Sequence, residues 1–400
     1  MNLPEDKKNS KLGSRIASAL SFIMLVVIMV LISYLVYLKS NNVDLQTIKV
    51  GEIFKGNLLM KSPDADGGGN SKIEYNAKDS SFFSTYKGYI VKCTNDSIKF
   101  LDKTGEEVWE KTLSISNPVI KTNGPDLLIA DSGGKNLYLI RDKEIKWTYK
   151  LDNNIINAEI SSGGYVTVVH EVKGYKGAVT VFNLQGGPFF TRNIAEGFVI
   201  TAKVSPKAKQ VLINTMDIGG IKANASIELT DMLGNPLGSK IQIEDTLFPA
   251  VWYLENETII GVGESKVLCW NKDGKTKWEA PFEGQEITSS TLLDGKSTVI
   301  ALGGESKNSI LSGSTSKILT ISAEGKQSEI YTISDSVKNL ASKDDVIAVN
   351  TGGEVHFIGA KGKLLYKYST KTDVTEVKFF SKDEAAVITK NSVEFIEIKN

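Results

Sequence analysis

A short unit recurs along most of this chain and constrains its fold more than any other feature. The unit has two apolar runs joined by a tight turn, a second turn that ends in glycine, and an aromatic residue four positions after that glycine. Three copies begin at Tyr89, Ile259 and Val346 and read YIVKCTNDSIKFLDKTGEEVWEKTL, IIGVGESKVLCWNKDGKTKWEAPF and VIAVNTGGEVHFIGAKGKLLYKYS. Short runs rich in Val, Ile, Tyr and Phe between such turns are typical of strands. The repeat therefore predicts an all-β domain.

The glycine and the aromatic residue of the unit have separate physical roles. Gly105 and Gly274 each end a hairpin loop of a length that commonly needs a positive φ near its end, which glycine adopts without a Cβ clash. Trp109 and Trp278 then lie on the following strand, where a large ring can cover the face of a neighbouring sheet. We expect these aromatic residues to pack between sheets.

The spacing of the units predicts a β-propeller. The marked strand positions are 109, 147, 190, 238, 278, 329 and 366, which gives seven units about 43 residues apart, close to the roughly 40–50 residues of a four-stranded blade. The chain from Asp373 reads as three more strands, and one strand around Ile73–Asn76 precedes the first unit. If that strand pairs with the last one, around Val393–Ile398, an eighth blade is complete and no sheet edge stays open. We prefer eight blades to seven, and either ring to an open solenoid.

A membrane anchor precedes the repeats. The run Ile16–Leu38 is uncharged, apolar and long enough to cross a bilayer as a helix. It exceeds the apolar core of a signal peptide, and no A-x-A-like cleavage site follows it. Lys7, Lys8, Lys11 and Arg15 precede the run, so the positive-inside rule places the N-terminus in the cytoplasm. The sequence predicts a cytoplasmic tail at 1–15, a signal-anchor helix at 16–38, a stalk at 39–70 and an extracytoplasmic propeller at 71–400, on the cell membrane.

Composition excludes several classes of function. Lys plus Arg and Asp plus Glu number 47 each, which gives no basic excess for a nucleic-acid partner. Cys93 and Cys269 both lie in apolar runs, so we expect free, buried thiols. With His170 and His356 as the only histidines, a multi-histidine metal site is not expected. No metal, cofactor or catalytic residue is predicted.

The turn-Gly-x-x-x-Trp unit at this period resembles the repeats of quinoprotein-like, or PQQ-type, β-propellers over residues 71–400. That family includes quinone-dependent dehydrogenases and non-catalytic scaffolds such as the outer-membrane assembly propeller lipoprotein. The layout also resembles membrane-anchored bacterial propeller proteins of unknown function. A dehydrogenase of the family would be expected to carry adjacent cysteines, which this chain lacks, so the resemblance implies the fold and not that chemistry.

A binding surface is expected on the loops that vary between units. The longest insertions between second and third strands are His170–Gly177, Met216–Ala225 and Gly303–Lys317. In a propeller these loops emerge on one face. Our candidate residues for binding a ligand or partner are Tyr175, Lys176, Asp217, Lys222, Glu305 and Lys307.

The function that these observations predict is a binding or scaffold module at the cell envelope, with a protein, peptide or glycan as partner and the lipid bilayer contacted through residues 16–38. The alternatives are an envelope enzyme that uses carboxylates in the propeller channel and a structural subunit of a larger membrane complex. Converging carboxylates in a pocket would favour the enzyme, whereas a broad bare face would favour the scaffold.

The anchor hypothesis predicts that the apolar run stays attached to the mature protein, because it lacks a small-residue cleavage site. Intact-mass measurement of protein extracted from membranes should give the full-length mass. A mature N-terminus beyond Leu38 would contradict the anchor.

Overall fold

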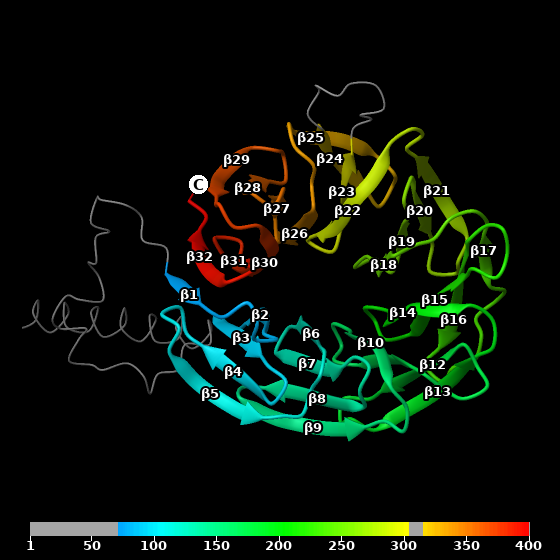
Figure 1. The fold of residues 1–400 in the computed structure, drawn as a ribbon. Coiled ribbons are helices and arrows are strands. Elements are labelled where there is room, and N and C mark those ends of the chain that lie inside the picture. Colours follow the sequence, from blue (N-terminus) through cyan, green and yellow to red (C-terminus); the bar gives the residue numbers. More distant parts are fainter. Residues whose placement is uncertain (1–70, 304–314, 400) are drawn as a thin grey trace, which may run out of the picture. The chain divides into compact units, whose positions relative to one another are not determined.

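Strands and turns, without a helix, make up the part of the chain that the computed structural model describes, residues 71–303 and 315–399. The strands form eight antiparallel sheets of four strands each. Figure 1 shows the sheets as blades arranged in a ring around a central axis. The first strands of most neighbouring blades contact one another and surround that axis. The expected all-β propeller with eight blades is thus confirmed.

Seven of the blades consist of four strands that follow one another along the chain. From blade 1 to blade 7 their strands are β2 (Phe82–Tyr86), β3 (Tyr89–Cys93), β4 (Ser97–Leu101) and β5 (Glu107–Thr112); β6 (Pro118–Asn123), β7 (Asp126–Asp131), β8 (Asn136–Arg141) and β9 (Glu144–Lys150); β10 (Ile155–Ile160), β11 (Val166–His170), β12 (Gly177–Phe182) and β13 (Pro188–Ile194); β14 (Phe198–Val204), β15 (Gln210–Asp217), β16 (Asn224–Asp231) and β17 (Ile241–Ile243); β18 (Ala250–Tyr253), β19 (Ile259–Val262), β20 (Lys266–Trp270) and β21 (Thr276–Pro281); β22 (Glu286–Leu293), β23 (Ser297–Gly303), β24 (Ser316–Ser322) and β25 (Gln327–Ile333); and β26 (Asn339–Lys343), β27 (Val346–Asn350), β28 (Glu354–Gly359) and β29 (Leu364–Ser369).

Blade 8 joins the two ends of the described chain. It contains β30 (Val374–Ser381), β31 (Glu384–Thr389) and β32 (Ser392–Glu397), and β1 (Lys72–Glu74) supplies its outermost strand. Ile73 lies opposite Val393 in this antiparallel pair. Two further backbone bonds, from Phe395 N–H to the Ser71 carbonyl and from Tyr75 N–H to the Asn391 carbonyl, extend the join. The expected closure of the ring is confirmed, because the first strand of the described chain pairs with the last one.

The hydrophobic core is divided among the gaps between blades. Eight clusters of buried apolar residues occur, and each draws its members from two neighbouring blades. The cluster between blades 8 and 1 includes Phe395 of β32 and Leu101 of β4, so the closing junction is packed like the others. Burial of each such side chain stabilises the ring by roughly 1.5–3 kcal/mol.

Second strands explain the continuous apolar runs in the sequence. Every residue of β7, β11, β19 and β27 is buried, because these strands are covered by blades on both sides. Outer strands such as β5 and β13 are mostly exposed instead. A strand buried on both faces reads as a nearly continuous apolar run, as in the LLIA of β7 and the VIAV of β27.

The outer strand of each of blades 2 and 3 packs against the turn glycine of the next blade. A Cβ added at Gly186 of blade 3 would lie 2.5 Å from the Trp147 ring of blade 2, and one at Gly234 of blade 4 would lie 2.8 Å from the Phe190 ring of blade 3. Gly186 also has a φ of +80°. The glycine of the repeat therefore serves both the turn and the contact between blades.

The ring closes through the same kind of contact. In blade 1 a Cβ on Gly105 would lie 3.1 Å from Ile73, a residue of the strand that completes blade 8. Ile73 thus stands where three other junctions place an aromatic residue, Trp147, Phe190 or Trp278.

The fourth unit departs from the predicted pattern. Position 238, expected on a strand, lies in the loop before the short strand β17. Gly234 and Gly238 both have positive φ, and Pro236 between them has no N–H to give to a sheet. Asp231 accepts backbone N–H bonds from Leu233 and Asn235, both at 2.8 Å, which holds the loop away from strand geometry.

Both cysteines are free and buried, as the sequence predicts. Burial raises the pKa of Cys93 to about 12 and that of Cys269 to about 11, so both thiols stay protonated at neutral pH.

The tail, the expected membrane helix at 16–38 and the stalk lie outside the described residues, as do Glu305 and Lys307. The described ranges hold no helix with the length and hydropathy of a membrane span.

The closing strand predicts a difference between two soluble fragments, one that begins at Ser71 and one that begins at Ser80. The shorter fragment lacks β1 and leaves the β32 edge unpaired, so its thermal midpoint should fall by several degrees. Thermal unfolding followed by circular dichroism measures both. Equal midpoints would show that β1 contributes nothing to the stability of the ring.

The glycine contact predicts that Gly186→Ala destabilises the ring by about 3 kcal/mol, from a left-handed backbone and a crowded Trp147 ring together. Gly88→Ala is the matched control, because Gly88 has a φ of +82° and nothing within 4 Å of the added Cβ. The control should cost only about 1 kcal/mol. Chemical denaturation that gives the two variants the same loss would contradict the contact.

Candidate functional site

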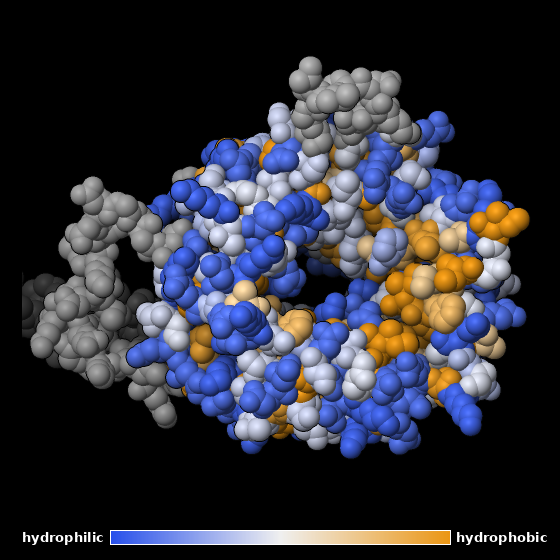
Figure 2. Space-filling model, viewed as in Figure 1, coloured by the Kyte–Doolittle hydropathy of each residue, from blue (hydrophilic) through white to orange (hydrophobic). Residues whose placement is uncertain are grey.

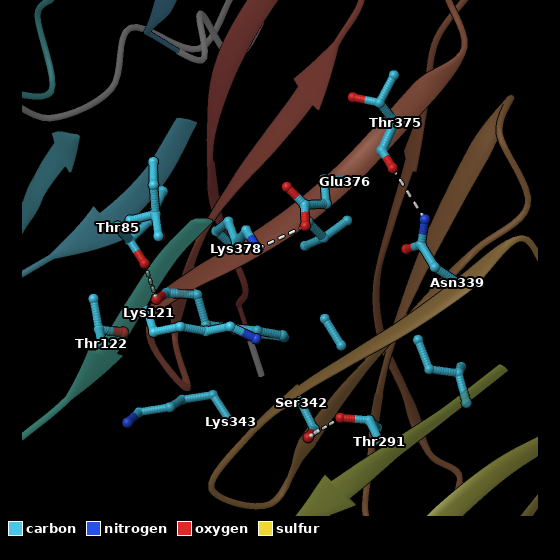
Figure 3. Close-up of a pocket in the computed structure, with 16 residues that line it drawn as sticks. Thr85, Lys121, Thr122, Thr291, Asn339, Ser342, Lys343, Thr375, Glu376 and Lys378 are labelled. Atoms are coloured by element: carbon cyan, nitrogen blue, oxygen red, sulfur yellow. Dashed lines mark hydrogen bonds and ion pairs between the residues drawn. The ribbon is translucent and has the colours of Figure 1, made fainter. Parts of the chain in front are cut away.

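The centre of the ring holds a cavity of about 750 Å³, lined by the first strands of blades 1, 2, 6, 7 and 8. Figure 2 shows the molecule hollowed at this point. Its lining is rich in hydroxyl, amide and charged side chains, labelled in Figure 3: Thr85, Lys121, Thr122, Thr291, Asn339, Ser342, Lys343, Thr375, Glu376 and Lys378. The channel is therefore a polar space inside an apolar ring.

Hydrogen bonds between blades fix the wall of this channel. Thr85 Oγ1 donates to the Phe379 carbonyl at 2.7 Å and joins blade 1 to blade 8. The Asn339 amide donates to the Thr375 carbonyl at 3.1 Å, which joins blade 7 to blade 8 (Figure 3). These bonds lie across the ring's junctions, so they hold the lining side chains in fixed positions.

Channel carboxylates are paired with lysines. Glu376 accepts from Lys378 at 2.6 Å, and Glu159 of β10 accepts from Lys121 at 3.1 Å. Sequence reasoning named channel carboxylates in general but none of these residues.

A second, smaller cavity of about 300 Å³ lies among blades 2 to 6. Glu159, Lys203, Trp252, Tyr253 and Glu255 are among its lining residues. Lys203 Nζ lies 3.6 Å from a Glu159 oxygen. Burial lowers the pKa of Lys203, while the charge of Glu159 opposes that shift.

The sequence carried a signal for this cavity. Lys203 is the one charged residue in FVITAKV, and Glu159 is the one charged residue in IINAEI. A lone charge in an otherwise uncharged first strand indicates a side chain that reaches the channel.

The structure brings the first four loop candidates to one side of two adjacent blades. Tyr175 and Lys176 lie between β11 and β12, while Asp217 ends β15 and Lys222 follows it before β16. The Lys176 ammonium lies 4.9 Å from the centre of the Phe198 ring, which joins the blade 3 loop to blade 4. Lys222 pairs with Asp245 at 2.6 Å on the surface.

Exposed apolar side chains gather on the same two blades. Of the 11 large apolar residues classed as exposed in the described ranges, nine belong to blades 3 and 4. Five of the nine lie at the starts of first strands or in the loops that carry the candidates, and we call them the apolar rim: Ile156, Tyr175, Phe198, Ile218 and Ile221. Figure 2 shows apolar surface collected around β14 to β19, while most of that face is hydrophilic.

Both histidines are engaged in hydrogen bonds. His170 Nε2 lies 2.9 Å from Thr180 Oγ1, and His356 Nδ1 lies 2.8 Å from the Tyr331 hydroxyl. Across the described residues no group of three or more His, Cys, Asp or Glu side chains is arranged to hold a metal ion.

Three solved structures are similar to this ring. BamB from Moraxella catarrhalis is 14% identical with a TM-score of 0.52, over 82% of this chain and 97% of that one. Sqt1 from Chaetomium thermophilum is 11% identical with a TM-score of 0.56, over 82% and 99%. A eukaryotic initiation factor is 12% identical with a TM-score of 0.54, over 84% and 88%. At these identities the likeness shows the fold alone, and BamB confirms the expected similarity to PQQ-type propellers.

No curated protein matches this sequence significantly. The model of a family of unknown function, DUF5711, matches residues 69–398. Because this match extends from before β1 to the end of β32, it covers the whole ring, and the chain belongs to the DUF5711 family.

Proposed function

We propose that the propeller is a protein-binding module of the cell envelope, tethered by residues 16–38 with the ring outside the cytoplasm. The observation that carries this proposal is the concentration of exposed apolar side chains on blades 3 and 4. Soluble proteins rarely expose contiguous apolar patches without a partner to cover them.

The chemistry of the apolar rim fits a protein segment with apolar side chains. Ile221 is fully exposed and Ile218 is 55% exposed, and both are aliphatic residues on one loop. Aliphatic groups offer no hydrogen bonds to the hydroxyls of a glycan, whereas they pack well against apolar side chains. Lys222 and Asp245 beside them form an exposed ion pair that can border such a contact.

Contacts that connect blades 3 and 4 beneath the apolar rim support this role. Lys176 over the Phe198 ring links the loop of blade 3 to the first strand of blade 4. Phe198 in turn lies opposite Met216 in the sheet of blade 4, two residues before Ile218. Strong local support reduces the ordering cost of binding.

An envelope enzyme is the alternative, and the channel is where its site would lie. Such an enzyme would use carboxylates with raised pKa values that converge on one point. Glu159 and Glu376 each form an ion pair with a lysine instead. The ion pairs therefore support the binding module over acid–base catalysis.

The proposal predicts that a photoactivatable cross-linking residue in place of Ile221 captures a protein in intact cells, because that side chain is fully exposed within the rim. The same probe in place of Leu364, which is 43% exposed on blade 7, is the matched control and should capture little. Mass spectrometry identifies the adducts. Equal capture at both positions, or adducts with lipid or glycan alone, would contradict the proposal.

The yield of the cross-linked adduct should depend on the apolar rim. Ile218→Asp places a charge in the apolar surface and should reduce the Ile221 adduct at least fivefold, whereas Leu364→Asp should leave it unchanged. Because both sites are exposed, neither change should lower the thermal midpoint.

A further inference from the structure

The smaller cavity, apart from the apolar rim, has the features of a ligand site. Its volume of about 300 Å³ is at the lower end of the range for small-molecule sites. It is lined by residues of β10, β14 and β18, which belong to blades 3, 4 and 5. We propose that this cavity binds a small monocarboxylate with a flat or apolar ring, whose carboxylate meets Lys203 and whose ring lies against Trp252.

Two lysines meet one carboxylate at one edge of the cavity: Lys203 and Glu159 line it, and Lys121 reaches Glu159 from the larger cavity. Lys121 and Lys203 both pair with Glu159, at 3.1 and 3.6 Å. Two ammonium groups thus share one carboxylate, and each has three N–H donors. A ligand carboxylate would balance these three side chains, while Glu255 carries a further negative charge on the lining.

The poor solvation of Lys203 is a further reason to expect an anionic ligand here. Burial lowers the pKa of Lys203, which means that water solvates its ammonium poorly. A carboxylate beside it would replace the missing solvation and favour the charged lysine. Charge-assisted hydrogen bonds of this kind are stronger than neutral ones.

Tyr253 supplies a second and independent indication. Its side chain is only 9% exposed and lines the cavity, and its buried hydroxyl has no hydrogen-bond partner among the described residues. A buried hydroxyl without a partner is costly. A ligand oxygen within reach would remove that cost.

The remaining lining residues select for size and charge. Trp252 is half-buried and offers an aromatic surface next to Tyr253. Glu255 is exposed on the lining and repels additional negative charge, which disfavours polyphosphates. Glu257, which faces Tyr253, is already paired with Lys207 at 3.7 Å. A single carboxylate on a small ring fits this combination.

Benzoate is the probe for the test, with benzyl alcohol as the uncharged molecule with the same ring. Saturation-transfer NMR on the full-length protein in detergent should show saturable binding of benzoate and none of benzyl alcohol. Inorganic phosphate should not displace benzoate. Failure of benzoate to bind, or displacement by phosphate, would overturn the proposal.

Two variants localise the site. Lys203→Met removes the charge, keeps an apolar chain of similar length and should weaken benzoate binding at least about tenfold. Lys121 still pairs with Glu159 in that variant, so no carboxylate is left alone. Lys343→Met, in the larger cavity, is the control and should bind benzoate normally. Unchanged thermal midpoints show that both variants fold, and equal weakening in the two would place the ligand elsewhere.

Discussion

The ring depends on one repeated contact, in which a large side chain on the outer strand of one blade lies against the turn glycine of the next. Trp147 against Gly186 and Phe190 against Gly234 are two instances. A flat blade has two apolar faces and cannot bury them alone, so its stability comes from its neighbours. The glycine allows the turn to bend and lets the neighbour approach. Blades joined in this way hold the channel at a fixed width.

Much of the fold could be predicted from the sequence because this contact leaves a mark on it. Gly105 and Trp109, four residues apart, repeat with the period of a blade, and the strand left over at Ile73 indicated how the ring closes. The prediction was wrong at position 238, where two glycines and a proline extend a loop. The repeat also could not show that Ile73 packs against the turn glycine at the closing junction, because no glycine-marked turn precedes Ile73.

The candidate sites were less predictable, for different physical reasons. Long loops can be recognised in the sequence as insertions between strands, so Tyr175 and Lys222 could be placed on the loops of successive units. The cavity around Lys203 joins residues of five blades that are far apart in sequence. Its signal is a single lysine in an apolar strand, and only the ring brings Glu159 and Trp252 beside it.

The three-residue strand β1 has a consequence for how the molecule is made. Its partner β32 lies more than 300 residues later in the chain, so the last blade to be synthesised must find a segment that left the ribosome before every other strand of the ring. Bringing the ends of so long a loop together is entropically costly, and contacts of such sequence separation slow folding. Blades 1 to 7 can stack as they emerge, one on the next. The nascent chain is then an open arc with an exposed apolar face at each end, and the final join is the step at which two arcs could exchange strands.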